Sequence, residues 1–167
     1  MYDPATSVQG LEAVAAAHPE SPAVKAALAA LQDLATDAKF DRGELTITVA
    51  RESITAAAKA AQSAGYTFLE DVTAVDWYPS EPRFQITYHI LSYSFKARLR
   101  LVVRLESTEA SLDSITPVWP SANFYEREIF DLFGVHFGGH PNLRRIMMPE
   151  DWQGHPLRKD YPVEGYR

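Results

Sequence analysis

Alternation of apolar and polar positions predicts several β-strands in the middle of the chain. Residues 45–49 alternate in this way, and residues 67–77 continue as a strand with a possible bend. Two clearer strands follow at 83–91 and 95–105, each with its large apolar side chains on one face. The link at 92–94 favours antiparallel pairing of these two strands, because a parallel pair needs a longer crossover.

Segments whose apolar residues have helical spacing alternate with these strands. Residues 22–35 predict a helix, with Ser21 as its N-cap and Pro22 at its first position. Residues 53–64 predict a second, alanine-rich helix that Gly65 would end. The order of helices and strands predicts an α+β fold, in which a mostly antiparallel sheet carries helices packed on one face.

The chain divides into a domain and a C-terminal arm. We expect the α+β domain over residues 1–133, with residues 1–21 as a loose N-terminal segment that holds a short helix at 7–17. The C-terminal arm, residues 134–167, is expected to be extended and irregular. Its four prolines and several glycines disfavour a helix or a central strand.

The last predicted helix carries charged residues inside an apolar pattern. It begins after Ser121, its expected N-cap, and ends at Gly134. On a helical wheel, Glu126 falls within the apolar arc. A buried carboxylate without a partner is costly, so we expect Glu126 to be shielded and paired with an arginine. The candidates are the arginines of the predicted sheet and, in the C-terminal arm, Arg144, Arg145 and Arg158.

The other side of this helix carries Arg127, Glu128 and Asp131. Charged residues usually face solvent. Arg127 and Asp131 are four positions apart, which allows a local ion pair worth only a few tenths of a kcal/mol. We therefore expect a solvated helix side.

Charge is unevenly distributed along the chain. Residues 1–133 hold 18 acids and 11 bases, a net charge of −7, and residues 134–167 hold 4 acids and 5 bases, a net charge of +1. An acidic domain argues against nucleic-acid binding. One predicted strand still presents a basic stripe, which we interpret as an ion-pairing surface within or between subunits. Its members are Lys96, Arg98, Arg100 and Arg104.

Composition excludes several kinds of chemistry. The chain has no cysteine, which excludes disulfides, thiolate metal sites and cysteine-ligated iron–sulfur clusters in it. Residues 1–10 lack the pattern of a signal peptide. No apolar stretch approaches the roughly 20 residues of a membrane-spanning helix, so we expect any membrane association to go through a partner.

Three histidines near acidic residues leave open an independent metal-dependent enzyme. These are His136, His140 and His155. The spacing of His136 and His140 resembles a zinc-binding pair, but that pair requires both rings on one helical face. Gly138 and Gly139 lie between the two histidines and disfavour a helix there.

The C-terminal arm keeps more large apolar side chains than a flexible linker would. They are Leu143, Ile146, Met147, Met148, Trp152, Leu157, Tyr161 and Tyr166. Aromatic and arginine side chains are the usual anchors of protein interfaces. We expect the C-terminal arm either to dock on a neighbouring protein or to fold back on its own domain.

The helix and the C-terminal arm resemble the C subunit, or 30-kDa-type subunit, of the proton-translocating NADH:quinone oxidoreductase, respiratory complex I. The motif consists of Glu126-Arg127-Glu128, Asp131, Leu132-Phe133, His140, Arg144 and Ile146. Similar stretches at 68–76, 83–92 and 154–162 extend the resemblance over roughly residues 40–163. It marks twenty residues as family signature and interface: Glu126, Arg127, Glu128, Asp131, Gly134, His140, Pro141, Leu143, Arg144, Arg145, Ile146, Gly154, His155, Pro156, Leu157, Arg158, Lys159, Asp160, Tyr161 and Pro162.

The resemblance implies a structural subunit in the hydrophilic arm of complex I, with no catalytic residue, cofactor or metal of its own. The complex transfers electrons from NADH to quinone through FMN and iron–sulfur clusters in other subunits, coupled to proton transport. The implied partners are chiefly the D subunit, which holds the quinone site, with the B and I subunits nearby. The implied location is peripheral, on the cytoplasmic face of the bacterial inner membrane. A homologous subunit of a membrane-bound hydrogenase or related dehydrogenase complex is the alternative.

Overall fold

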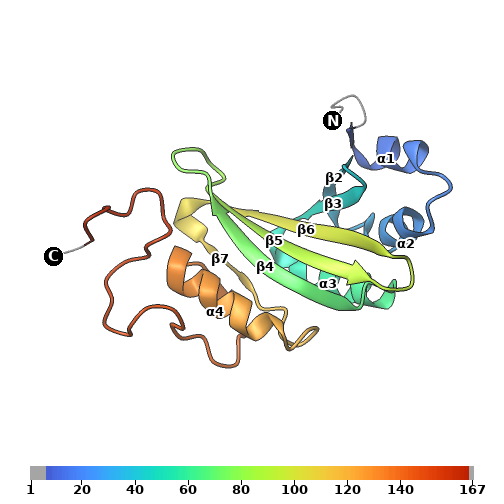
Figure 1. Ribbon diagram of the computed structural model, residues 1–167. Coiled ribbons are helices and arrows are strands. Elements are labelled where there is room, and N and C mark those ends of the chain that lie inside the picture. The colour runs from blue at the N-terminus through green and yellow to red at the C-terminus, as the bar shows by residue number, and fades with distance from the viewer. Residues whose placement is uncertain (1–6, 166–167) are drawn as a thin grey trace.

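The computed structural model describes residues 7–165 of the 167-residue chain, so residues 1–6 and the expected anchor Tyr166 lie outside the described part. Two short 3-10 turns occur at Arg51–Ser53 and Ser107–Glu109. The helices and strands, in chain order (Figure 1), are β1 (Val8–Gln9), α1 (Leu11–Ala17), α2 (Pro22–Leu31), β2 (Ala35–Asp41), β3 (Glu44–Val49), α3 (Ile54–Ser63), β4 (Phe68–Asp76), β5 (Phe84–Ser92), β6 (Ala97–Leu105), β7 (Ser111–Asp113), α4 (Ala122–Phe133) and β8 (His136–Gly138).

A six-stranded sheet in the order β1-β2-β3-β6-β5-β4 forms the centre of the molecule (Figure 1). Every neighbouring pair is antiparallel except β3 and β6, which run parallel. The predicted α+β fold with a mostly antiparallel sheet is therefore confirmed. The parallel contact between β3 and β6 was not predicted, because no sequence pattern links these two strands.

One face of the sheet and the helices bury the hydrophobic core. Its largest members from β5 and β6 are Phe84, Ile86, Tyr88, Ile90, Leu99, Leu101, Val103 and Leu105. These are the side chains that the alternation placed on one face. Burying an apolar side chain of this size stabilises the fold by about 1.5–3 kcal/mol. Small residues of α3, such as Ala57 and Ala61, are also fully buried and let the helix approach the sheet closely.

The opposite face of the sheet carries most of the predicted basic stripe, and two of its arginines form ion pairs within the chain. Arg98 contacts Glu70 at 2.9 Å and Glu44 at 3.6 Å, and Arg100 contacts Glu44 at 3.3 Å. Lys96 does not belong to the stripe, because it lies in the β5–β6 turn with a φ of 51°. The ion-pairing interpretation therefore holds for the two central arginines.

The helix predicted at 22–35 begins as expected, with the Ser21 hydroxyl accepting a hydrogen bond from the Val24 N–H at 3.3 Å. It ends at Leu31, however, and β2 begins at Ala35 after a three-residue turn. Sequence reasoning missed β2 because its alanine, aspartate and lysine residues have low strand propensity. A usable signal was the two-residue turn Arg42-Gly43, whose φ angles of 54° and 81° are those of a tight hairpin.

The N-terminal segment is not loose over residues 8–17. Val8 pairs with Phe40 of β2, and α1 begins at Leu11 and buries Val14 completely. A short helix was expected over 7–17, and it occupies the last seven of those positions. Within residues 7–165, no helix is both long and apolar enough to cross a membrane.

Candidate docking site at the junction of α4 and the C-terminal arm

Helix α4 packs beside β4, the edge strand of the sheet, and leads into the C-terminal arm (Figure 1). The Tyr125 hydroxyl fixes the helix by donating to the Glu70 carbonyl at 2.8 Å. Gly134 ends the helix in the left-handed conformation, with a φ of 71°, as predicted. The helix begins directly after Ser121, as predicted, but the Ser121 side chain makes no capping hydrogen bond.

Glu126 is fully buried, as the helical wheel predicted, but its expected arginine partner was wrong. Its carboxyl group instead accepts hydrogen bonds from the Ser114 hydroxyl at 2.5 Å and from the Ile115 N–H at 2.8 Å. Burial raises the pKa of Glu126 to about 7, although these two donors oppose the shift. The missed partners lie in the loop before α4, where no charge pattern marks them.

The ring of His140 lies next to Glu126 but does not compensate its charge. His140 Nε2 is 3.9 Å from Glu126 Oε2 and 3.2 Å from the Asn123 carbonyl oxygen, which can only accept. His140 Nδ1 accepts from the Asn142 N–H at 3.0 Å. Burial lowers the pKa of His140, so the ring is neutral at pH 7 and leaves Glu126 without a cation.

Asp131 was expected on the solvated side of α4, and that expectation was wrong. The side chain is fully buried beneath the C-terminal arm. Its Oδ2 accepts from three consecutive backbone N–H groups, those of residues 146–148, at 2.7–2.9 Å. Its Oδ1 contacts Arg145 Nη1 at 2.6 Å. Burial alone would raise the pKa of Asp131, but these donors together hold it below its usual value.

Arg127 is also covered by the C-terminal arm and does not pair with Asp131. Its guanidinium donates to the carbonyls of Arg144 at 3.2 Å and Arg145 at 3.3 Å. Glu128 remains exposed, as expected. The helical wheel could assign a side of the helix but could not reveal that a later irregular segment covers most of it.

The C-terminal arm supplies hydrogen-bond donors to the last turn of α4, whose carbonyls have no partner within the helix. Three groups donate to three successive carbonyls: His155 Nδ1 to Asp131 (2.9 Å), the Leu157 N–H to Leu132 (3.1 Å) and Arg158 Nε to Phe133 (2.5 Å). The positive charge of Arg158 is also favourable at a helix C-terminus. Helix and arm are thus structurally dependent on each other.

Gly134 permits this close packing. Any side chain there would adopt an unfavourable positive φ. A Cβ atom would also lie 2.5 Å from the His155 ring and 2.6 Å from Arg158 Nη2. The position therefore requires glycine for two independent reasons.

A second attachment holds the end of the C-terminal arm to the β4–β5 hairpin. Arg83 contacts Asp76 at 2.8 Å and Asp160 at 2.6 Å, and the Lys159 N–H donates to Asp76 Oδ2 at 2.9 Å. Burial opposes ionisation of Asp76, but Arg83 and the backbone donors bring its pKa to about 2. Arg83 and Asp76 were not among the expected site residues, although an acid and an arginine flanking a short loop offered a signal.

The C-terminal arm thus turns polar groups inward and leaves apolar side chains outside. Met147 is 62% exposed, Leu157 is 52% exposed and Val163 is fully exposed. Ile146 and Trp152 are also exposed. This arrangement reverses that of an ordinary surface loop and is typical of a surface that another protein covers.

The remaining residues expected at the interface differ in how far they are exposed to solvent. Leu143 packs against the hydrophobic core. The exposed members are Pro141, Arg144, Lys159 and Pro162. Half-buried members are Gly154, Pro156 and Tyr161, whose hydroxyl donates to the Gln153 carbonyl at 3.3 Å.

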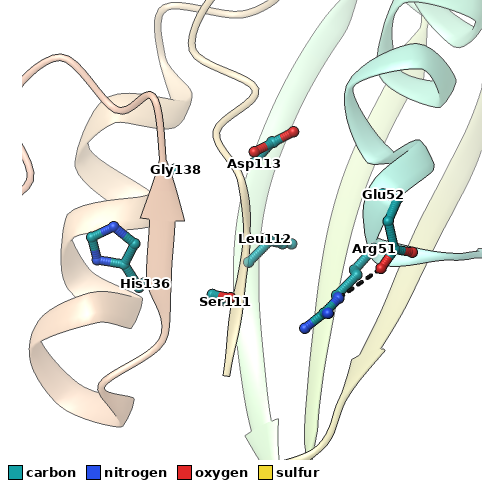
Figure 2. Close-up of a pocket in the computed structure, with 7 residues that line it drawn as sticks. All are labelled: Arg51, Glu52, Ser111, Leu112, Asp113, His136 and Gly138. Atoms are coloured by element: carbon teal, nitrogen blue, oxygen red, sulfur yellow. Dashed lines mark hydrogen bonds and ion pairs between the residues drawn. The ribbon is translucent and has the colours of Figure 1, made fainter. Parts of the chain in front are cut away.

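The three histidines of the metal-site alternative do not come together. His140 contacts Glu126 and His155 caps α4, whereas His136 lines an open pocket of about 320 Å³ between β7 and the 3-10 turn at Arg51–Ser53 (Figure 2). Arg51 in this pocket is already paired with Glu52 and with Glu109, both at 2.7 Å. Among residues 7–165, no group of three or more His, Cys, Asp or Glu side chains is arranged to hold a metal ion.

Comparison with known proteins identifies the family. Residues 47–167 match the model of the respiratory-chain NADH dehydrogenase 30 kDa subunit. The chain belongs to this family, as its motifs indicated.

Similar sequences include the C subunits of the NADH-quinone oxidoreductases of three bacteria. The protein of Citrifermentans bemidjiense is 49% identical over 125 residues, covering 74% of this chain and 78% of that protein. That of Geobacter sulfurreducens is 48% identical over 131 residues, covering 77% and 81%. That of Roseiflexus castenholzii is 45% identical over 148 residues, covering 86% and 85%.

Two solved structures share the fold. A trypsin-resistant fragment of Nqo5 is 31% identical, with a TM-score of 0.55 over 60% of this chain and 83% of the fragment. A chain of the membrane-bound sulfane sulfur reductase, an archaeal respiratory membrane complex, has a TM-score of 0.71 over 81% of this chain and 82% of its own. That chain is 24% identical, so its likeness shows the fold alone.

Proposed function

We propose that this chain is a structural subunit of the hydrophilic arm of NADH:quinone oxidoreductase and that its C-terminal arm docks on a neighbouring subunit. The observation that carries the proposal is the reversed polarity of the C-terminal arm, with Asp131 and Arg83 holding its inner side and Met147 and Leu157 exposed on its outer side. Family membership supports the choice of complex. That complex passes electrons from NADH through FMN and iron–sulfur clusters to quinone and couples this transfer to proton translocation.

We assign the redox chemistry to other subunits. The absence of cysteine supports this assignment, because iron–sulfur clusters are bound by cysteine thiolates. The charged groups of the docking site are also engaged in holding the C-terminal arm: Asp131 accepts four hydrogen bonds at its carboxylate and Arg127 binds two carbonyls. Such groups position a segment and are unsuited to exchanging protons with a substrate.

The proposed principal partner is the quinone-site D subunit, with the B and I subunits nearby, on the cytoplasmic face of the bacterial inner membrane. The proposal keeps the division into a domain at 1–133 and an arm at 134–167. In it, the signature residues act mainly by fixing the C-terminal arm, so that its apolar side chains are presented together. No specific observation favours a hydrogenase complex, since the similar sequences cited above are NADH-quinone oxidoreductase subunits.

Affinity purification of the tagged chain from its native host tests the proposal. The D, B and I subunits should copurify with the wild-type chain. A Met147→Ser/Leu157→Ser variant should lose them, because both side chains are more than half exposed on the outer surface of the arm. Substitution is preferable to truncation, which would also remove the donors that cap α4. Full recovery of the three subunits with this variant, or a wild-type chain that purifies alone, would contradict the proposal.

A further inference from the structure

Two exposed aromatic side chains of the domain lie where the C-terminal arm ends. Trp77 and Tyr78 directly follow β4 and are 46% and 48% exposed. Figure 1 shows the β4–β5 loop that contains them close to the last part of the C-terminal arm. Single exposed aromatic residues are ordinary, but neighbouring ones beside an apolar surface indicate an interaction site.

The ion-pair cluster at Arg83 couples these aromatic residues to the C-terminal arm. The Arg83 guanidinium lies 5.0 Å from the centre of the Tyr78 ring and also binds Asp160. The carboxylate of Asp76 accepts from the Tyr78 N–H at 2.9 Å and from the Lys159 N–H at 2.9 Å. The backbone of the loop and that of the C-terminal arm therefore share one carboxylate, which fixes their relative position.

The neighbouring part of the C-terminal arm has a largely apolar outer surface. A shallow hollow of about 390 Å³ forms there, lined mainly by rings and aliphatic groups that include Trp152, Pro156, Tyr161, Pro162 and Val163. Val75 of β4 is also exposed, on the sheet face that carries Arg104, whose guanidinium lies 6.0 Å from the centre of the Trp77 ring. Exposed apolar side chains therefore occur both on the β4–β5 loop and on the neighbouring part of the C-terminal arm, and Arg83 and Asp76 hold these two segments together.

We infer that Trp77 and Tyr78 belong to the same docking surface as the C-terminal arm and that the one subunit which binds the arm also covers them with an apolar groove. This inference rests on the proposed function and deepens it. Large, rigid aromatic side chains dominate the energetics of protein interfaces. Because Arg83, Asp76 and Asp160 fix them against the arm before association, little side-chain and loop entropy is lost on binding.

The test uses the tagged full-length chain expressed in its native host and measures the amount of the D subunit recovered per tagged chain. A Trp77→Ser/Tyr78→Ser variant should reduce this ratio at least about tenfold, the effect expected for loss of two interface anchors. The matched control is Phe68→Ser/Tyr93→Ser. Phe68 and Tyr93 are 46% and 66% exposed, their rings are 5.8 Å apart, and Phe68 lies at the opposite end of β4.

The outcomes separate the inference from the proposed function. The Trp77→Ser/Tyr78→Ser variant could recover the D subunit at the wild-type ratio while the Met147→Ser/Leu157→Ser variant loses it. This result would overturn the inference but would still support docking through the C-terminal arm. Wild-type ratios for both variants would overturn both. Equal loss with the Phe68→Ser/Tyr93→Ser control would also overturn the inference, because the effect would then be unspecific.

Photo-crosslinking makes the result independent of folding defects. A benzophenone amino acid at position 77 of the chain in the intact complex should crosslink to the same subunit as one at position 157. A crosslink from position 77 to a different subunit, or to none, would contradict the single docking surface.

Discussion

Helix α4 carries two fully buried carboxylates whose surroundings act on ionisation in opposite directions. Glu126 faces the domain, where one hydroxyl and one N–H reach it and His140 is neutral. Asp131 faces the C-terminal arm, where three N–H groups and Arg145 reach it. Burial raises the pKa of Glu126 to about 7, whereas the donors around Asp131 outweigh burial and lower its pKa.

The difference follows both from the number and charge of the donors and from the deeper position of Glu126 in the domain. On the domain side of α4, the structure accommodates Glu126 in its protonated form. The arm side requires the negative charge, because that charge organises residues 145–148 around it. The helix therefore joins a core that is more stable when its acid is protonated with an arm that depends on an ionised acid.

The largest effect is expected from Asp131→Ala. Removing one partner of a buried, hydrogen-bonded charge pair costs about 3–5 kcal/mol. Here the loss should appear as detachment of the C-terminal arm from a folded domain. Hydrogen exchange of the amides at 146–148 should accelerate strongly, while the amides of β5 and β6 stay protected. The control is Glu128→Ala, which removes an exposed carboxylate from the same helix, and equal exchange in the two variants would contradict the role of Asp131.

Glu126→Gln tests the other half of the comparison through pH. The folded pKa of Glu126 is about 7 and its ordinary value is 4.5, so the folded state holds an extra proton between these values. The resulting stability is fully present below pH 4.5 and is lost as the pH rises to about 7, a change of about 3 kcal/mol.

The Glu126→Gln variant should lack this change, because its amide cannot ionise. Urea unfolding at pH 5 and pH 8 measures it. The variant should gain stability relative to the wild type between these two pH values. Parallel pH dependence of the two proteins would show that Glu126 is ionised throughout and that its burial is better compensated than the donors suggest.

Gly134→Ala perturbs the Asp131 surroundings without changing either carboxylate. The left-handed backbone costs an alanine about 1–2 kcal/mol, and its Cβ would displace His155 and Arg158. The C-terminal arm should loosen, and the pKa of Asp131 should rise toward its usual value. NMR titration of the Asp131 carboxyl carbon measures this shift. An unchanged pKa would mean that Asp131 keeps its donors without the capping contacts at the helix end.

Ser114→Ala should have the smallest effect. Loss of the hydroxyl donor removes one hydrogen bond worth about 1 kcal/mol and should raise the pKa of Glu126 further. The pH at which the free energy of unfolding declines should move upward together with this pKa. A downward shift would indicate that water entering the vacated space solvates the carboxylate better than the serine does.

Local periodicity predicted most of the sheet and the ends of α4. The strands at 45–49, 83–91 and 95–105 are β3, β5 and β6 with small changes at their ends. The strands that were not predicted lack a strong local sequence signal. β2 has weak strand propensity, and β7 and β8 contain only three residues each, too few to show alternation.

The candidate site was predictable in part, since the apolar arc of the helix predicted the burial of Glu126. It did not predict the donors from Ser114 and Ile115, because these come from an irregular loop. Asp131 was misplaced because the segment that covers it is brought back by tertiary contacts that leave no periodic signal.

The parallel contact between β3 and β6 has a consequence for synthesis of the chain. β3 ends at Val49, and its partner begins only at Ala97, whereas all other strand pairs of the six-stranded sheet join neighbours in sequence. During synthesis on the ribosome, the β3 edge of the β2–β3 hairpin therefore stays unpaired until β6 emerges. An open strand edge is a site for unwanted pairing with other chains. Chaperone demand should accordingly be greatest while residues 50–105 are being made.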